Sequence, residues 1–203
     1  LDISRIESGK TRLVEMEYDT QEMLRSIVSR IRLRSTEKEL LFDVTIDEVL
    51  PSRLYGDAGK IKQIVLNLLT NAVKYTDVGG FILSVSMEER SGELACLRFS
   101  VKDTGMGIKK EDMEKLFTAY ERLDEQKNSS IQGTGLGLDI SRKFAEMLAG
   151  KLWCESVYGE GSEFIFTVTQ RIVDSTPIGV FVEHDEGAVK GPYAPQFIAP
   201  DAD

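Results

Sequence analysis

The segment from Asp57 to Tyr75 constrains the fold more than any other part of the chain. Its apolar side chains keep a helical period throughout, at Ile61, Ile64, Val65, Leu68, Leu69, Ala72 and Val73. A helix with one continuous apolar stripe has to bury that stripe against a sheet or another helix. The sequence therefore predicts a long amphipathic helix here, with the Asp57 carboxylate as its N-terminal cap.

Shorter periodic segments predict the remaining elements. Further helices are expected at residues 20–37, where Asp19 and Glu22 form a capping box, and from Leu136 to Leu148. Alternating apolar and polar residues predict strands at residues 13–16, 40–46, 81–87, 97–101, 151–157 and 163–169. This order favours an α/β (α+β) two-layer sandwich, in which a mixed, mostly antiparallel sheet carries its helices on one face.

Net charge limits the partners that this chain can bind. The 203 residues carry a formal net charge of -9, which repels nucleic acid and anionic membrane surfaces, so neither is expected as a partner. Cys96 and Cys154 lie in apolar surroundings without metal-ligand spacing, which favours a reduced cytoplasmic compartment, although a disulfide between them stays open. No apolar run approaches the roughly 18 residues needed to cross a bilayer.

The two ends of the chain differ from its middle. Residues 1–10 (LDISRIESGK) have the pattern of a helix tail that enters from a preceding segment and stops at Ser8-Gly9. Residues 11–172 contain the periodic elements and form the expected domain. Residues 173–203 carry prolines among glycines and acids, which is typical of a linker that is poorly ordered or runs extended against the domain.

A polar ridge follows the long helix opposite its apolar stripe, over about 80° of arc. Its members are Lys60, Gln63, Asn67, Asn71 and Lys74. Solvated helix faces are usually rich in Glu and Lys, whereas this ridge is centred on two carboxamides. Their oxygens can bind a hard cation, and a lysine ammonium can meet a phosphate. An ordinary amphipathic helix would look similar, so the ridge alone leaves both interpretations open.

Two glycine-containing turns are the other candidate binding elements. In residues 103–108 (DTGMGI), glycines let the backbone approach a flat ligand, and a strand-end carboxylate can accept a hydrogen bond from an exocyclic amine. In residues 133–138 (GTGLGL), free amides at a helix N-terminus suit a polyphosphate. Simple turns before a helix would show the same residues. The second turn lacks the Walker signature, and a polar loop rather than a strand precedes it, which argues against a dinucleotide fingerprint.

Together these segments resemble the sequence boxes of bacterial sensor histidine kinases. QIVLNLLTNAVKYT is similar to the N box of that family, DTGMGI to its G1 box, LFTAYERLD to its F box and GTGLGL to its G2 box, in the family's order. LDISRIESGK resembles the end of the dimerisation helix, and GEGSEF resembles the closing hairpin. The resemblance spans most of residues 1–170 and implies the Bergerat-type ATP-binding fold, shared with gyrase, MutL and Hsp90-like ATPases.

The resemblance implies a role in binding ATP and Mg²⁺ for each matching residue. Asp103 is similar to the adenine-reading aspartate, and Asn71 is similar to the asparagine that holds magnesium. The implied catalytic residues are Asn67, Lys74 and Arg122. The implied nucleotide-binding residues are Asn71, Lys74, Tyr75, Asp103, Gly105, Gly107, Gly133, Thr134, Gly135, Leu136 and Gly137. Residues 119–132 are the implied ATP lid, in which Tyr120 stands where phenylalanine is commoner.

The resemblance also implies the reaction, which is transfer of the ATP γ-phosphate to a histidine in a dimerisation domain outside this chain. The single histidine, His184, does not match the family's Ser-His-Glu acceptor and is expected to be a solvated linker residue. Two alternatives stay open. An ATPase of the gyrase, MutL or Hsp90 kind would need a water-activating glutamate where this sequence has Asn67. A non-catalytic nucleotide sensor would bind ATP without transferring phosphate.

Partners are implied for the parent protein as well. They are its own dimerisation domain, a second copy in a homodimer and the receiver domain of a response regulator. The final FIAPDAD resembles the lead-in to a receiver domain in hybrid kinases. The domain itself is expected in the cytoplasm without direct membrane contact, whether or not the parent is anchored in a membrane.

Overall fold

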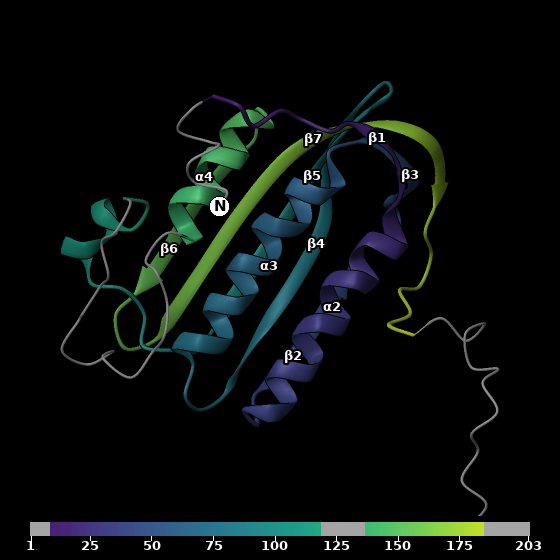
Figure 1. The fold of residues 1–203 in the computed structure, drawn as a ribbon. Coiled ribbons are helices and arrows are strands. Elements are labelled where there is room, and N and C mark those ends of the chain that lie inside the picture. Colours follow the sequence, from purple (N-terminus) through teal and green to yellow (C-terminus); the bar gives the residue numbers. More distant parts are fainter. Residues whose placement is uncertain (1–8, 119–136, 185–203) are drawn as a thin grey trace, which may run out of the picture.

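The computed structural model describes residues 9–118 and 137–184, in which the helices cover one face of a single sheet (Figure 1). The strands are β1 (Met16–Asp19), β2 (Leu41–Ile46), β3 (Pro51–Gly56), β4 (Gly80–Ser91), β5 (Leu94–Asp103), β6 (Lys151–Val157) and β7 (Gly161–Pro177). The helices are α2 (Thr20–Glu37), α3 (Ala58–Tyr75), α4 (Gly137–Met147) and a short 3-10 helix, η1 (Lys110–Lys115). The predicted two-layer α/β sandwich is therefore confirmed.

The sheet is mixed and mostly antiparallel, as predicted. Its main path runs β1-β3-β7-β5-β4-β2, with β6 added beside β7, and only β2 and β4 run parallel to each other within the described residues. Strand β3 was not predicted, because PSRLYG begins with proline and contains arginine, so it lacks strand-like alternation. Pairing with β3 also places β1 at Met16–Asp19, later than the predicted residues 13–16.

The core lies between the sheet and the helical layer. The predicted stripe of α3 is buried from Ile61 to Ala72, and α2 adds an equally buried face along its own length. On the sheet side the rings of Phe99 and Phe166 stack with their centroids 5.7 Å apart. Among the described helices, none is both long and apolar enough to span a bilayer. Cys96 and Cys154 are free thiols on separate strands, β5 and β6.

A buried ion pair ties the N-terminus of α3 to the segment that enters the domain. The Asp57 carboxylate accepts hydrogen bonds from the amides of Lys60 (3.0 Å) and Val14 (2.8 Å) and from the Lys60 ammonium (2.9 Å). The same ammonium donates to the carbonyl of Arg12 and lies over the ring of Phe144 in α4. Asp57 caps α3 as predicted, but Lys60 is bound inside the fold and does not belong to an open polar ridge.

The C-terminal segment belongs to the domain further than predicted. Strand β7 continues to Pro177, beyond the expected boundary at residue 172, because its last part pairs with β3. Residues 178–184, here called the strap, then cross α2: Arg32 forms an ion pair with Glu183, and Ile178 and Phe181 pack on the core. His184 is exposed, as expected. Residues 1–8 and 185–203, which include the predicted helix tail and most of the predicted linker, lie outside the described residues.

Replacing Asp57 by asparagine tests how strongly the buried pair stabilises the fold. The new carboxamide would keep one capping oxygen but would leave the Lys60 ammonium without its carboxylate, so D57N should lower the free energy of unfolding by about 3 kcal/mol near neutral pH. Burial alone raises the pKa of Asp57, but the amides of Val14 and Lys60 and the Lys60 charge outweigh it, so the pKa lies below its ordinary value.

A depressed pKa means that the stabilisation by Asp57 is present above the unfolded-state pKa and is lost as the pH falls through the folded-state value. Urea titrations of both proteins should therefore show a large difference at about pH 7 that shrinks toward about pH 3. A difference that stays constant over this range would contradict the assignment.

Candidate functional site

Several predicted residues within the described part of the chain lie at one end of the sandwich, where α3 ends, β5 ends and β7 begins (Figure 1). Strands β5 and β7 pair there, with Asp103 opposite Ser162. Helix α3 stops at Tyr75 because Thr76 adopts an extended backbone (φ -109°, ψ 115°). The chain then leaves the helix beside the end of β5, so two segments distant in sequence, around Tyr75 and around Gly105, lie in contact.

Asp103 is a buried carboxylate with one oxygen committed to the backbone. Its Oδ1 accepts hydrogen bonds from the amides of Gly105 (2.9 Å) and Ser162 (3.4 Å). Its Oδ2 has no hydrogen-bond partner among the described residues. Burial raises the pKa of Asp103, and the two amide hydrogen bonds offset this only in part. The site therefore presents a carboxylate oxygen that is available to a donor from outside the chain.

Gly105 lets the turn after β5 approach Tyr75 and Asp103 closely. A Cβ at this position would lie 2.5 Å from the carbonyl oxygen of Tyr75 and 2.9 Å from Asp103 Oδ1, so no larger residue fits without movement of the backbone. Gly107 has a different constraint: its φ is +68°, and a Cβ there would collide with the Val157 carbonyl. Both glycines thus let the turn after β5 fold tightly against its neighbours, which shapes this side of the pocket.

Thr76, the last residue of QIVLNLLTNAVKYT, was not predicted as a site residue, but it lies beside Asp103. Its side chain is fully buried, and its Oγ1 has no hydrogen-bond partner within the described part of the chain. A Cβ built on Gly105 would lie 3.2 Å from this oxygen and 2.9 Å from Asp103 Oδ1, so the hydroxyl and the carboxylate are neighbours. Buried hydroxyls are normally paired, so an unpaired one beside a buried carboxylate marks a place for a polar ligand.

Ser162 and Ser156 also support the pocket without having been predicted. The Ser162 amide holds Asp103, and the Ser156 hydroxyl accepts a hydrogen bond from the amide of Ile108 (2.8 Å) and lies 2.9 Å from Ser162 Oγ. Ser162 lies in GEGSEF, so the resemblance to a closing hairpin was the one signal that could have indicated it. The strand pairing that aligns it with Asp103 is not readable from local sequence.

Three predicted residues of α3 lie along the helix toward this pocket. The Lys74 ammonium lies 5.1 Å from the centroid of the Tyr75 ring, so these two predicted residues are together. Further back along the helix, Asn67 Nδ2 donates to Ser141 Oγ in α4 (2.8 Å), and a Cβ at Gly137 would collide with Asn67 Oδ1. Asn67 therefore faces the first turn of α4, whose free amides suit an anion.

Asn71 lies between these groups, half-buried, and makes no polar contact with another described residue. No group of three or more His, Cys, Asp or Glu side chains that could hold a metal occurs in residues 9–118 or 137–184. The described residues therefore offer no all-protein metal cage. A single carboxamide oxygen, that of Asn71, fits magnesium, which commonly takes one or two protein oxygens and completes its shell with water and phosphate oxygens.

Part of the prediction cannot be placed. Arg122 and most of the glycine turn lie outside the described residues, as does the whole of the predicted lid at residues 119–132. The glycine-turn residues concerned are Gly133, Thr134, Gly135 and Leu136. Gly137 is the first residue of α4 and is described.

Comparison with known proteins agrees with this geometry. The profile of the family described as "Histidine kinase-, DNA gyrase B-, and HSP90-like ATPase" matches residues 56–172. Hybrid signal transduction histidine kinase B of Dictyostelium discoideum is 35% identical over 176 residues, which is 87% of this chain and 9% of that protein. Sensor protein GacS of Pseudomonas syringae pv. syringae is 35% identical over 164 residues, 81% of this chain and 18% of GacS.

A solved structure shows the same architecture. Full-length ShkA, crystallised in complex with AMPPNP, superimposes with a TM-score of 0.72 at 29% identity over 84% of this chain and 34% of ShkA. This chain spans less than a fifth of the length of the Dictyostelium discoideum kinase and of GacS. Because relatives occur in both an amoeba and a bacterium, a bacterial origin stays a prediction.

The matched profile covers α3, the pocket strands and α4, which are the elements that bring the predicted residues together. The chain therefore belongs to the family of histidine kinase-, DNA gyrase B- and HSP90-like ATPases, and its fold is that of a histidine kinase catalytic domain.

Proposed function

We propose that this domain binds ATP with its adenine against Asp103 and transfers the γ-phosphate to a histidine outside the chain. The observation that carries the proposal is the buried Thr76 hydroxyl, which has no partner among the described residues, beside the Asp103 carboxylate, of which only Oδ1 is hydrogen-bonded to the described backbone. An adenine edge presents both a donor amine and ring acceptors, so it would pair with a carboxylate and a hydroxyl at once. The predicted fold and boxes support the same assignment.

Recognition at the base end depends on desolvation. A buried carboxylate forms stronger hydrogen bonds than one in water, and a ligand that leaves it unpaired loses the full desolvation cost. Asp103 would accept from the exocyclic amine, which guanine replaces with a carbonyl oxygen at the equivalent ring position. Two oxygens would then face each other. The pocket should consequently prefer adenine nucleotides to guanine nucleotides.

At the phosphate end, α3 and α4 would supply positioning and charge neutralisation, which is most of what phosphoryl transfer requires. Lys74 would contact a phosphate, and the first amides of α4 at Gly137 would meet another. Asn71 would hold Mg²⁺ through its carbonyl oxygen, and the bound ion would neutralise charge on the phosphates. Arg122 and the turn of residues 133–136 are proposed for the same end on the resemblance alone.

The phosphate acceptor that we propose lies in a dimerisation domain of the parent protein. His184 is the last residue of the strap, which hydrogen bonds and an ion pair hold to Gln21 and Arg32 of α2. Asn67 favours transfer over hydrolysis, because a carboxamide bound to Ser141 cannot take a proton from water, as a general base must. This observation argues against the ATPase alternative of the gyrase or Hsp90 kind.

The partners follow from the relatives, several of which are named hybrid kinases. We propose that the parent protein is a homodimer through its dimerisation domain, passes phosphate to a receiver domain and keeps this domain in the cytoplasm. A receiver after residue 203 is one form of this arrangement. The acidic surface, with a net charge of -9, disfavours nucleic acid and anionic membranes as additional partners.

Replacing Asp103 by asparagine should separate nucleotide binding from folding. The substituted side chain can still accept from the Gly105 amide, but it would present an amide donor to the exocyclic amine, so affinity for Mg-ATP should fall at least about tenfold. Because the folded-state pKa of Asp103 is raised, the ionised form disfavours the fold at neutral pH, and D103N should unfold at an equal or higher temperature.

Isothermal titration calorimetry and thermal unfolding measure the two effects. The matched control is Asp43→Asn, which removes the same charge from an exposed position on β2 and should leave both values unchanged. Normal Mg-ATP affinity in D103N would remove the basis of the proposal.

Phosphotransfer needs a separate test. The chain alone should bind Mg-ATP, hydrolyse it slowly and acquire no phosphate, whereas a longer form of the protein that includes a phosphoacceptor histidine should form acid-labile phosphohistidine. The measurement is incorporation of radiolabelled γ-phosphate, with and without acid treatment. Rapid ATP hydrolysis by the chain alone would favour the ATPase alternative. Normal ATP binding with no phosphohistidine in the longer form would favour a nucleotide sensor.

A further inference from the structure

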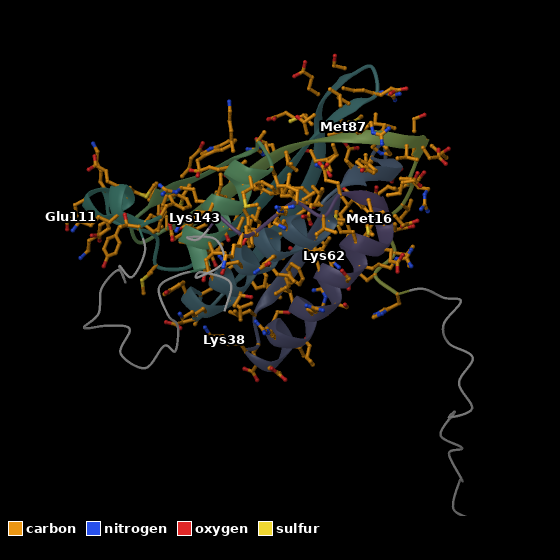
Figure 2. The ribbon with its side chains drawn as sticks, turned by 45° about the horizontal axis from the view of Figure 1, so that its top comes forward. Met16, Lys38, Lys62, Met87, Glu111 and Lys143 are labelled. Atoms are coloured by element: carbon orange, nitrogen blue, oxygen red, sulfur yellow. The ribbon has the colours of Figure 1, made fainter. Side chains whose placement is uncertain are left out.

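Lys38 binds the C-terminus of α3 from the neighbouring helix. It is the residue that follows α2, and its ammonium donates to three carbonyl oxygens: Val73 (2.7 Å), Lys74 (3.2 Å) and Thr76 (2.8 Å). An ammonium has three hydrogens to donate, so all of its donors are matched. Figure 2 shows Lys38 at the end of the helical layer where α2 and α3 both finish.

These carbonyls are the ones that a helix end leaves open. The last carbonyls of an α-helix have no partner within the helix and carry the negative end of its dipole, so a cation there is favourable. Lys38 also lies 3.7 Å from Asp77, but that carboxylate is almost fully exposed and contributes little. The important contacts are therefore those to the backbone on both sides of Tyr75.

The bound carbonyls flank the part of the chain that lines the adenine pocket. Tyr75 contributes the carbonyl oxygen that would lie 2.5 Å from a Gly105 Cβ, and Thr76 contributes the unpaired hydroxyl beside Asp103. Lys38 binds the residues before Tyr75 and the carbonyl of Thr76 itself. These three hydrogen bonds fix the direction in which the backbone leaves α3. They therefore also fix the position of the Thr76 hydroxyl.

We infer that Lys38 is a positioning residue for nucleotide binding, which acts through Tyr75 and Thr76 without touching the ligand. The inference rests on the proposed function, since it assumes that an adenine nucleotide occupies this pocket. The Lys38 ammonium holds the backbone at the end of α3 in place, and the Thr76 hydroxyl stays free for the base. Loss of the ammonium would let the backbone at Tyr75 and Thr76 move and would weaken binding of the base.

The experiment compares Lys38→Met and Lys38→Arg with the unaltered chain. Methionine keeps an apolar stem and removes all three donors, so the affinity for ADP without magnesium should fall about tenfold, the size expected for losing hydrogen bonds to a charged group. The same loss is expected with Mg-ATP, because the metal lies at the other end of the ligand. Arginine keeps charge and donors and should restore most of the affinity.

Lys151→Met is the matched control, because Lys151 is exposed at the start of β6 and has no side-chain partner among the described residues. It removes one positive charge and should leave the affinity unchanged. Binding is measured by calorimetry at a temperature where thermal unfolding shows each variant to be folded. If the methionine variant does not fold, the arginine variant decides: an affinity within about threefold of the unaltered chain is expected, and a loss greater than about threefold overturns the inference.

A double-mutant cycle with Thr76→Val tests the route of the effect. If Lys38 acts by placing Tyr75 and Thr76, the two substitutions together should weaken ADP binding by less than the product of their separate effects. Equal affinity of the Lys38→Met variant and the unaltered chain, or independent effects in the cycle, would overturn the inference. Failure of the unaltered chain to bind ADP or Mg-ATP would instead refute the proposed function, so the two failures are distinguishable.

Discussion

The packing of α3 on the sheet sets the position of the candidate site residues that this helix carries. Its buried stripe, from Ile61 to Ala72, fixes the rotation of the helix about its axis, so Asn67, Asn71 and Lys74 face away from the core. Bonds at both ends then fix its direction: Asp57 and Lys60 join the N-terminus to the entering chain, and Lys38 holds the C-terminus. The pocket exists because this fixed helix ends beside β5.

The domain keeps polar groups unpaired where they serve a ligand. Thr76 Oγ1 is buried in a place where a folded protein would normally supply a partner, and leaving it unpaired disfavours the nucleotide-free state. Pairing by a nucleotide would recover that free energy only on binding. The raised pKa of Asp103 expresses the same cost, because burial disfavours its ionised form. The ionised Asp103 carboxylate thus lowers the stability of the fold at neutral pH, although ligand recognition would require it.

The first and the last described segments are both held to the helical layer. Residues 12–14 bind the Asp57–Lys60 pair at the N-terminus of α3. The Lys60 ammonium also lies over the ring of Phe144, so the first described segment, α3 and α4 meet at this ion pair. At the other end the strap crosses α2 and is held by Arg32, which binds Glu183 and the Phe42 carbonyl. Both segments are anchored to the helical layer rather than to the outer face of the sheet.

Local sequence by itself determined the helices, most strands and the binding boxes. Periodicity located α2 and α3 because each apolar stripe recurs over consecutive turns. Asp103, Gly105 and Gly107 were identified through the resemblance of DTGMGI to a family box, since a simple turn would show the same residues. Only the tertiary structure decided the place of β3, the extension of β7 and the roles of Thr76, Ser162 and Lys38. Each of these depends on a pairing between segments far apart in the chain, such as Lys38 with Thr76 or Asp103 with Ser162, and local periodicity carries no information about which distant backbone groups will meet.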